Sequence, residues 1–388
     1  MAFEVADRLK RLPPYLFSEI DRKKKAALAA GRDVINLGIG DPDTPTPAFV
    51  IEALARHARD PATHTYALDE GDPGLRRAVA DFMKRRFGVE LDAAGELLPL
   101  IGTKEGIGHL PLALLDPGDA ALVPEPCYPP YRSGTIFAGA EPIYMPLARE
   151  RGFLPDLEAI RPADAARAKA SYVNYPNNPT GAVAPRAFYE SLVAFAEAND
   201  LVIVSDAAYT ELALEGERPM SLLEVPGARA RTIEFHSFSK TFNMTGWRVG
   251  WAAGAAGLVA ALGRVKSNLD SGVFTAIQRA AAEALGRYDE FVPGLCATYR
   301  ARRDALCEGL ARLGWEVERP RATFYVWAPV PGGGSSIEAS SHILEEADIV
   351  CTPGVGFGAP GEGFVRFALT VGEERLAEAV ERLAKLRW

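Results

Sequence analysis

Between about residues 48 and 280, the hydrophobic positions follow two different patterns. Apolar Leu75, Val79 and Phe82 recur at helical spacing and predict a helix over 74–87. Residues 201–204 instead form a continuous apolar run that ends at Asp206, which is typical of a strand buried on both faces. Alternation of such strands and helices predicts an α/β layer with a largely parallel sheet.

The same patterns predict further elements in this region. Helices are expected over 47–59 and 186–198, and a further helix is expected to open at the glycine-bounded segment 102–106. Strands are expected at 120–123, 171–175, 201–204, 232–236 and 249–253. Since ligands of such sheets bind beyond the carboxyl ends of the strands, the residues that follow each strand are the candidates for function.

The order of the predicted helices and strands changes after about residue 280. A long helix is predicted over 282–313, followed by strands at 315–317, 323–327 and 364–369 and a final helix from 373. The proline-rich stretch 41–47 cannot be regular throughout and reads as a connector. We therefore expect three parts: residues 1–47 as an N-terminal arm and part of a small domain, 48–280 as a large domain, and 281–388 as a small C-terminal domain.

Composition narrows the class of protein. Apolar residues make up 48% of the chain and charged residues 24%, and the net charge is −8. This charge argues against nucleic acid or an anionic membrane as a main partner, and no stretch of about 18 apolar residues predicts a membrane span. The basic run 22–25 is interpreted as a solvated helix face, and the N-terminus has no pattern of a signal peptide.

Cysteine and histidine usage gives no sign of a metal site. The four cysteines and five histidines are scattered, without CxxC or HExxH spacing. Free thiols fit a reducing compartment, so we expect a cytoplasmic protein without a bound metal.

Chemistry-bearing side chains follow three of the predicted strands. Asn178 lies in a Pro- and Gly-rich turn after the strand at 171–175, Asp206 ends the next strand with Tyr209 three residues later, and Ser237, Ser239 and Lys240 follow the strand at 232–236. An amide, a carboxylate, a phenol and an amine should thus converge at one edge of the sheet.

These groups suit a phosphorylated pyridine aldehyde. A desolvated lysine can form an imine with the aldehyde, and a carboxylate beside the ring nitrogen keeps that nitrogen protonated. Arg248, two serine hydroxyls and the start of the helix at Thr103 could bind the phosphate, and Tyr128 could stack on the ring. Each motif alone is a common loop or turn. Lys104 is the rival for the imine-forming lysine, but it lacks an upstream Asp and a downstream Arg at matching distances.

Taken together, the motifs resemble those of fold-type I pyridoxal-phosphate aminotransferases. The resemblance runs from the segment 38–42 through 178–181 and 237–240 to Arg366, and so covers essentially the whole chain. Within that group the segments 12–17, 38–43 and 265–272 most resemble those of LL-diaminopimelate aminotransferases. The resemblance implies a large domain with a mostly parallel seven-stranded sheet between helices, and a smaller α+β domain.

The resemblance also assigns roles. Lys240 would bind the cofactor covalently and move the substrate proton, with Asp206 at the ring nitrogen and Asn178 and Tyr209 at the ring oxygen. The other implied cofactor contacts are Thr103, Lys104, Tyr128, Ser237, Ser239, Arg248 and, from the partner subunit of a homodimer, Tyr66. Arg366 would take the substrate α-carboxylate, and Tyr15, Gly40 and Asn178 would line the substrate pocket. The segment 268–271 is expected to face the partner's site.

The implied activity is transamination between LL-2,6-diaminopimelate and 2-oxoglutarate in lysine biosynthesis. Other donors of related enzymes, namely aspartate, alanine or methionine, stay open, as does a pyridoxal-phosphate lyase on the same scaffold. A transcription regulator with an aminotransferase-like domain is disfavoured, because the matching region begins near residue 12 and leaves no room for a DNA-binding domain.

Overall fold

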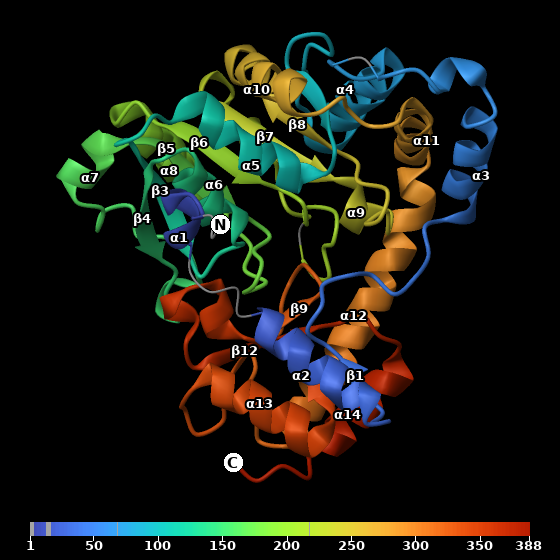
Figure 1. Ribbon diagram of the computed structural model, residues 1–388, viewed down its shortest axis with the longest axis vertical. Coiled ribbons are helices and arrows are strands. Elements are labelled where there is room, and N and C mark those ends of the chain that lie inside the picture. The colour runs from blue at the N-terminus through green and yellow to red at the C-terminus, as the bar shows by residue number, and fades with distance from the viewer. Residues whose placement is uncertain (1–3, 13–16, 68, 217) are drawn as a thin grey trace.

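The computed structural model describes residues 4–12, 17–67, 69–216 and 218–388. Figure 1 shows an upper body built around a large sheet and a lower body that contains the C-terminal strands and helices of the chain. Tyr15 lies outside the described residues. None of the helices in the described ranges combines the length and the apolar character that crossing a bilayer requires.

The upper body contains a seven-stranded sheet in the order β2-β8-β7-β6-β5-β3-β4. Only β8 runs against its neighbours, so the sheet is mixed and mainly parallel. The expected fold class is confirmed. The strands are β2 (Leu97–Leu100), β3 (Ala120–Glu125), β4 (Glu141–Pro146), β5 (Ala168–Asn174), β6 (Val202–Asp206), β7 (Thr232–Ser237) and β8 (Gly250–Gly254).

Successive residues of these strands point to opposite faces, and helices cover both. On one face Val123, Val204 and Ala252 pack with the helices α5 (Thr103–Leu114) and α10 (Ala256–Leu269). On the other face Ile203 packs with α8 (Arg186–Ala198), and Trp251 packs with α4 (Pro73–Phe87). Period-two alternation with both faces apolar explains why these strands read as continuous hydrophobic runs.

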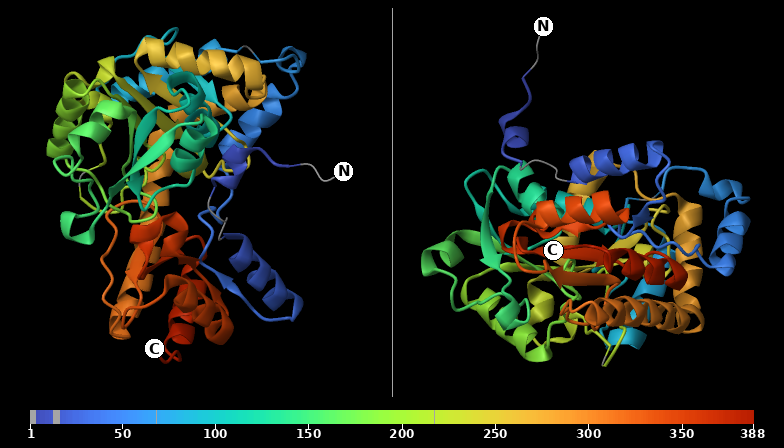
Figure 2. Two further views of the ribbon diagram at one scale, coloured as in Figure 1. Left: turned by 60° about the vertical axis from the view of Figure 1, so that its left-hand side comes forward. Right: turned by 90° about the horizontal axis from the view of Figure 1, so that it is seen from below.

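The remaining helices of the upper body lie around this core. They are α3 (Ala48–His57), α6 (Pro130–Phe137), α7 (Pro162–Arg167), the short α9 (Phe238–Thr241) and α11 (Thr275–Gly286). The 3₁₀ turns are η1 (Pro61–Thr63), η2 (Arg149–Arg151), η3 (Leu222–Glu224) and η4 (Ala228–Ala230). The N-terminal α1 (Asp7–Lys10) contacts α6, apart from the rest of the N-terminal segment (Figure 2).

The lower body holds two small sheets. An antiparallel sheet has the order β11-β12-β9, and β1 pairs in parallel with β10. The strands are β1 (Ile35–Asn36), β9 (Tyr325–Pro329), β10 (Ile349–Val350), β11 (Thr352–Pro353) and β12 (Phe364–Ala368), with α2 (Phe17–Ala29), α13 (Ser336–Ala347) and α14 (Glu373–Leu383) beside them and the turns η5 (Gly354–Phe357) and η6 (Ala359–Gly361). The pairing of β1 with β10 places part of the N-terminal arm in the lower body.

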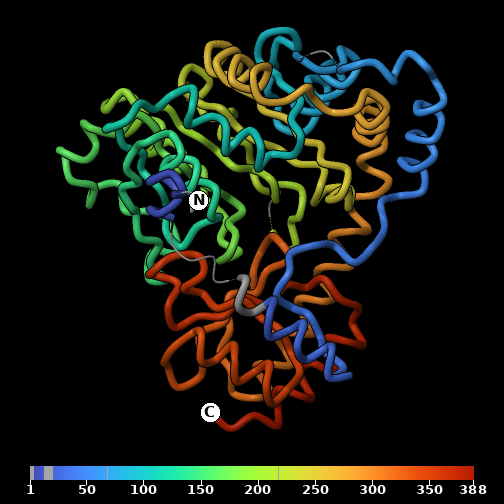
Figure 3. Tube along the Cα trace, in the orientation of Figure 1, coloured from blue at the N-terminus to red at the C-terminus, as the bar shows by residue number. Residues whose placement is uncertain are grey.

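Two predicted elements differ from the structure. The predicted strand at 315–317 is irregular, because none of the strands in the described ranges pairs with it to form a ladder. The predicted helix 282–313 is two helices, α11 and α12 (Tyr288–Arg312), with Arg287 between them outside helical geometry. Figure 3 follows the chain from α2 in the lower body to α3 at the edge of the upper body.

Candidate active site

A cavity of about 780 Å³ lies where the carboxyl edge of the large sheet meets the lower body. Among the residues predicted from the sequence, those that line it are Gly40, Thr103, Lys104, Tyr128, Asn178, Asp206, Tyr209, Ser237, Ser239, Lys240, Arg248 and Arg366. Tyr66 does not line this cavity and is 89% exposed. The structure thus brings together twelve residues that come from separate parts of the chain.

Lys240 extends into the cavity from the short helix α9. Its Nζ donates to the carbonyl oxygen of Gly40 at 2.8 Å and lies 5.4 Å from the centre of the Phe324 ring. Burial lowers the pKa of the Lys240 ammonium to about 8; the Asp41 carboxylate opposes this shift, and the cations of Arg366 and Arg248 add to it. Such a lysine is neutral far more often at physiological pH than an ordinary one.

Asp206 ends β6 at the floor of the cavity and is 5% exposed. Its Oδ2 accepts a hydrogen bond of 2.7 Å from the Tyr131 hydroxyl, and its Oδ1 accepts one from the Ala208 amide. Burial raises the pKa of Asp206 to about 6, and the two hydrogen bonds oppose this shift. A carboxylate held in this way is ready to accept an N–H from a heterocyclic cation.

Arg366 is a buried cation on β12. Its Nη1 donates to Asn178 Oδ1 and its Nη2 to the Gly38 carbonyl oxygen, each at 2.8 Å, and its Nε has no partner among the described residues. The rings of Tyr325 and Phe357 lie 4.1 Å and 4.7 Å from its guanidinium carbon. No carboxylate within the described ranges pairs with Arg366. A buried guanidinium with this surrounding suits a planar anionic ligand.

The opposite end of the cavity is formed by the start of α5. No side chain of the described residues caps this helix, whose first residues Thr103 and Lys104 line the cavity. Gly102 has φ 73°, and a β-carbon there would overlap Nη2 of Arg248. The guanidinium therefore lies directly against the helix start. Amide N–H groups, a guanidinium and the hydroxyls of Ser237 and Ser239 together make an anion site.

Asn178 and Tyr209 lie between these two ends. The backbone N–H of Asn178 donates to Asn174 Oδ1 at 2.8 Å, which fixes the position of Asn178. The Tyr209 and Tyr325 hydroxyls are 2.9 Å apart, and burial raises the pKa of Tyr209, so the phenol stays protonated. Both side chains present polar groups to the middle of the cavity.

Comparison with known proteins decides the family. The family model described as "Aminotransferase class I and II" matches residues 32–383. The chain belongs to the class I and II aminotransferases. This confirms the family predicted from the sequence.

Several relatives match this aminotransferase over its whole length. The LL-diaminopimelate aminotransferase of Syntrophobacter fumaroxidans is 57% identical over 387 residues, which is 100% of both chains. The enzyme of the same name from Desulforudis audaxviator is 55% identical and covers 99% of this chain and 98% of its own. The aspartate aminotransferase from Thermus thermophilus solved with maleate superposes with a TM-score of 0.92 at 34% identity, covering 99% of this chain and 100% of its own. A substrate-bound BacF structure from Bacillus subtilis gives a TM-score of 0.95 at 40% identity, covering 99% and 98%.

Class I and II aminotransferases depend on pyridoxal 5′-phosphate, and the residues present fit that group. The uncapped start of α5 beside Arg248 suits a phosphate, and Asp206 suits a protonated ring nitrogen. Lys240, with its lowered pKa, suits an aldehyde. The donor set of this aminotransferase therefore matches the phosphate, the ring nitrogen and the aldehyde of the cofactor.

Two tyrosines of the site were missed by the sequence reasoning. Tyr131 is buried, bonds Asp206, and stacks on Tyr172 with ring centres 5.3 Å apart. Its position three residues after Tyr128, across the turn that opens α6, is the signal that could have found it, since the two rings lie 5.9 Å apart. Tyr325 follows no such pattern, because its contact with Arg366 depends on the pairing of β9 with β12.

The basic run 22–25 is only partly the solvated face that the sequence predicted. Lys24 and Asp21 line the mouth of the cavity, and the Lys24 side chain is 18% exposed. Its Nζ lies 3.3 Å from an oxygen of Asp21. Asp21 and Lys24 of α2 therefore face the site, while Arg22 and Lys25 of the same run are exposed.

A cluster near the start of α5 has the composition of a metal site. Oxygen or nitrogen atoms of Glu105, His109 and Asp270 lie within 4.8 Å of one another. The buried ammonium of Lys266 lies 2.6 Å from Asp270 and 3.5 Å from Glu105. Lysine thus supplies the positive charge that these carboxylates require.

Proposed function

We propose that this chain is an LL-2,6-diaminopimelate aminotransferase of lysine biosynthesis that uses 2-oxoglutarate as the amino acceptor. The observation that carries the substrate is full-length identity of 57% and 55% to enzymes of that name. The cavity supports it with the buried Arg366 guanidinium, which pairs with no carboxylate of the described residues and suits an α-carboxylate, and with a lysine of lowered pKa. We expect the enzyme to act in the cytoplasm.

The proposed cofactor contacts follow the geometry described above. Thr103, Lys104, Ser237, Ser239 and Arg248 would bind the phosphate. Asp206, Asn178, Tyr209 and Tyr128 would hold the ring, and Lys240 would hold the aldehyde carbon. When bound, pyridoxal phosphate supplies an electron sink that makes the substrate α-proton acidic.

The residues of the chain then have separate tasks. Arg366 orients the substrate by binding its α-carboxylate, and the Asn178 and Gly38 oxygens fix the plane of the guanidinium. The Lys240 amine would take the α-proton of the substrate and return it to the former aldehyde carbon of the cofactor, since its lowered pKa lets it act in both directions near neutral pH. Asp206 keeps its partner nitrogen protonated, and Tyr131 fixes the carboxylate.

We also propose a homodimer with shared active sites. Tyr66 is 89% exposed and would reach the phosphate in the partner subunit, and the segment 268–271 would face the partner's substrate. Tyr15 and Gly40 would line the substrate pocket. The division into residues 1–47, 48–280 and 281–388 stays a prediction; it places α12 with the small domain, although α12 contributes to the cores of both bodies.

A panel of amino donors with 2-oxoglutarate tests the substrate. We expect glutamate formation with LL-diaminopimelate to exceed that with aspartate, alanine and methionine by at least tenfold in kcat/KM. Ping-pong kinetics are expected, because one amino group is carried on the enzyme between two half-reactions. Lys240→Ala is the control and should abolish turnover.

The possible outcomes test the substrate, the reaction type and the catalytic lysine separately. Failure with LL-diaminopimelate but turnover of another donor would overturn the substrate and keep the aminotransferase. Release of ammonia and a keto acid without glutamate would instead indicate a lyase. Normal turnover by Lys240→Ala would contradict the assignment of the catalytic lysine.

A further inference from the structure

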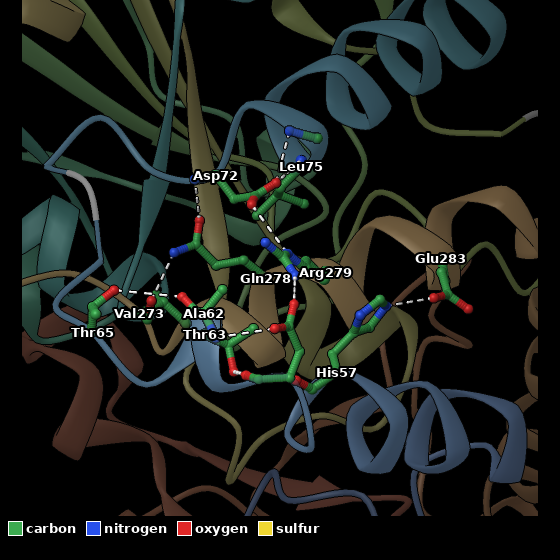
Figure 4. A network of polar contacts seen from close by, with 12 residues as sticks. His57, Ala62, Thr63, Thr65, Asp72, Leu75, Val273, Gln278, Arg279 and Glu283 are labelled. Atoms are coloured by element: carbon green, nitrogen blue, oxygen red, sulfur yellow. Dashed lines mark hydrogen bonds and ion pairs between the residues drawn. The ribbon is translucent and has the colours of Figure 1, made fainter.

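Two loops at the edge of the upper body share one support. The first connects α3 to α4 over residues 58–72 and carries Tyr66. The second connects α10 to α11 over 270–274 and follows Asn268. Tyr66 and the segment 268–271, which overlaps the second loop at 270–271, were proposed above to face the partner's active site. Their described residues are held by one turn of α11 (Figure 4).

Gln278 links the two loops directly. Its side chain is 1% exposed, and both ends of its amide are bonded. Oε1 accepts from the backbone N–H of Asp72 at 2.7 Å, and Nε2 donates to the carbonyl oxygen of Val273 at 2.7 Å. A buried amide bonded at both ends fixes the spacing of the two backbones, because release of either bond would leave an unsatisfied buried group.

Arg279 links the two ends of the first loop. Its Nη1 donates to Asp60 Oδ2 at 2.9 Å, and its Nε lies 3.5 Å from Asp72 Oδ2. The other oxygen of each carboxylate accepts from its own backbone: Asp60 from Ala62, and Asp72 from the first turn of α4. The guanidinium thus ties together two carboxylates that already define the conformation of the loop.

The described residues just after Asp60 are also held by contacts of their own. The buried Thr63 hydroxyl donates to the Asp60 carbonyl oxygen at 2.9 Å, and the His64 ring lies 6.4 Å from the Phe274 ring of the second loop. Tyr66 follows directly and turns outward from this base, at 89% exposure. An exposed side chain on a firmly held base is what a contact in trans requires, since a mobile loop would lose entropy on docking.

We propose that Gln278 and Arg279 are positioning residues that join the two loops into one rigid element, and that this element acts on the active site of the partner subunit rather than on its own. The inference rests on the shared active site of the proposed homodimer. It does not depend on which amino acid is the donor.

The first test replaces Arg279 in the homodimer. Arg279→Met should raise the pyridoxal-phosphate concentration that half-saturates the lysine-bound cofactor absorbance by about tenfold, as expected for the loss of one charge-assisted contact. Arg56→Met is the matched control: it removes an equal charge that also binds α11, through Glu283, but it touches neither loop. Arg56→Met should leave cofactor affinity within twofold of the parent protein. Equal effects of the two variants would overturn the proposal.

Mixed dimers test the action in trans. In the first dimer, one subunit carries both Lys240→Ala and Arg279→Met, and the other subunit is unchanged. The one active site that keeps Lys240 is then contacted by the altered loops of its partner. In the second, one subunit carries Lys240→Ala and the other Arg279→Met; the functional lysine receives intact loops. Both dimers contain the same substitutions, so a general loss of stability affects them equally.

We expect weakened cofactor binding in the first dimer alone, in absorbance and in activity. Weakening in the second alone would show action in cis, and equal affinities would show a merely structural role; either overturns the inference. A fully active monomer would also overturn it. Gln278→Met should repeat the pattern and serves if the arginine variant fails to fold. Residual activity of the Lys240→Ala homodimer would instead count against the proposed function.

Discussion

At the scale of the residue, burial sets the chemistry of this site. Lys240, Asp206 and Arg366 are ordinary side chains whose charged forms are disfavoured by their surroundings. A bound ligand would therefore stabilise the charged forms of these groups more than they stabilise one another, which is typical of functional sites.

The lowered pKa of Lys240 has a measurable consequence for the apoprotein. Only the neutral amine reacts with an aldehyde, and a pKa of about 8 makes about half of the lysine neutral at pH 8. We expect the rate of pyridoxal-phosphate capture to rise between pH 7 and 9 and then level off. A rate that still rises steeply above pH 9.5 would indicate an ordinary lysine. Stopped-flow absorbance against pH makes this measurement.

The raised pKa of Asp206 predicts that this carboxylate lowers the stability of the apoprotein at neutral pH, although activity requires it. Its folded pKa of about 6 lies above the unfolded value of 3.8, so its favourable contribution exists below pH 3.8 and is lost as the pH rises through 6. At pH 8 the buried carboxylate costs about 3 kcal/mol relative to a neutral group. Asp206→Asn should stabilise the apoprotein in urea at pH 8, with a difference that shrinks toward pH 4, and should cut turnover severely. A variant less stable than the parent at pH 8 would contradict this reading.

At the scale of the element, the start of α5 and the lysine-bearing turn do most to shape the site. Gly102 lets the chain enter α5 with φ 73° and lets Arg248 lie against the helix start. Both features require the absence of a β-carbon.

Gly102→Ala should therefore displace Arg248 and weaken pyridoxal-phosphate binding by tenfold or more, since a guanidinium–phosphate contact is lost. Gly88→Ala is the matched control: Gly88 has φ 68°, but its β-carbon would meet open space. The control should lose about 1 kcal/mol of stability from backbone strain and keep its cofactor affinity. Equal cofactor affinities of the two variants would argue against a phosphate at this end. Absorbance titration and urea unfolding separate the two effects.

Elements with a strong local pattern were predictable from the sequence. The helix over 186–198, the strand that ends at Asp206 and the strand that precedes Lys240 have apolar patterns. These patterns can be recognised from neighbouring residues alone. The predicted strand at 315–317 was wrong because an alternating pattern forms a strand only where a partner lies beside it. Trp315 instead sits in the lower core and donates its indole N–H to the Pro329 carbonyl oxygen.

At the scale of the whole molecule, the sequence predicted which side chains meet but not how they are oriented. Asp206 and Lys240 follow neighbouring parallel strands, so their convergence follows from topology alone. The contacts of Tyr131 and Tyr325 depend on packing between distant segments, which no local pattern encodes. The same holds for Lys24, whose place at the cavity mouth depends on where α2 docks.

The proposed dimer makes a prediction at this scale. Leu269 lies in the segment 268–271 expected to face the partner and is 57% exposed, and Phe274, three residues after that segment, is 42% exposed. Leu269→Arg should weaken self-association and lower specific activity together, because each active site would lose the residues supplied in trans. Sedimentation and activity measured over one dilution series check this. The exposed Leu313, at 39%, is the control position on the lower body; Leu313→Arg should change neither. Full activity of a monomeric Leu269→Arg protein would contradict shared sites.

The helix α12 joins the two bodies in a way that bears on how the molecule loses its structure. Its first turns, with Tyr288 and Val292, belong to the core of the upper body, and its last turns, with Leu306 and Leu310, belong to that of the lower body. Unfolding of either core would release one half of this single 25-residue helix, which contains Pro293 near its start, and would weaken the other half. We therefore expect the two bodies to unfold in one cooperative transition. A destabilising substitution far from the cavity, in either body, should then also lower the stability of the site between them.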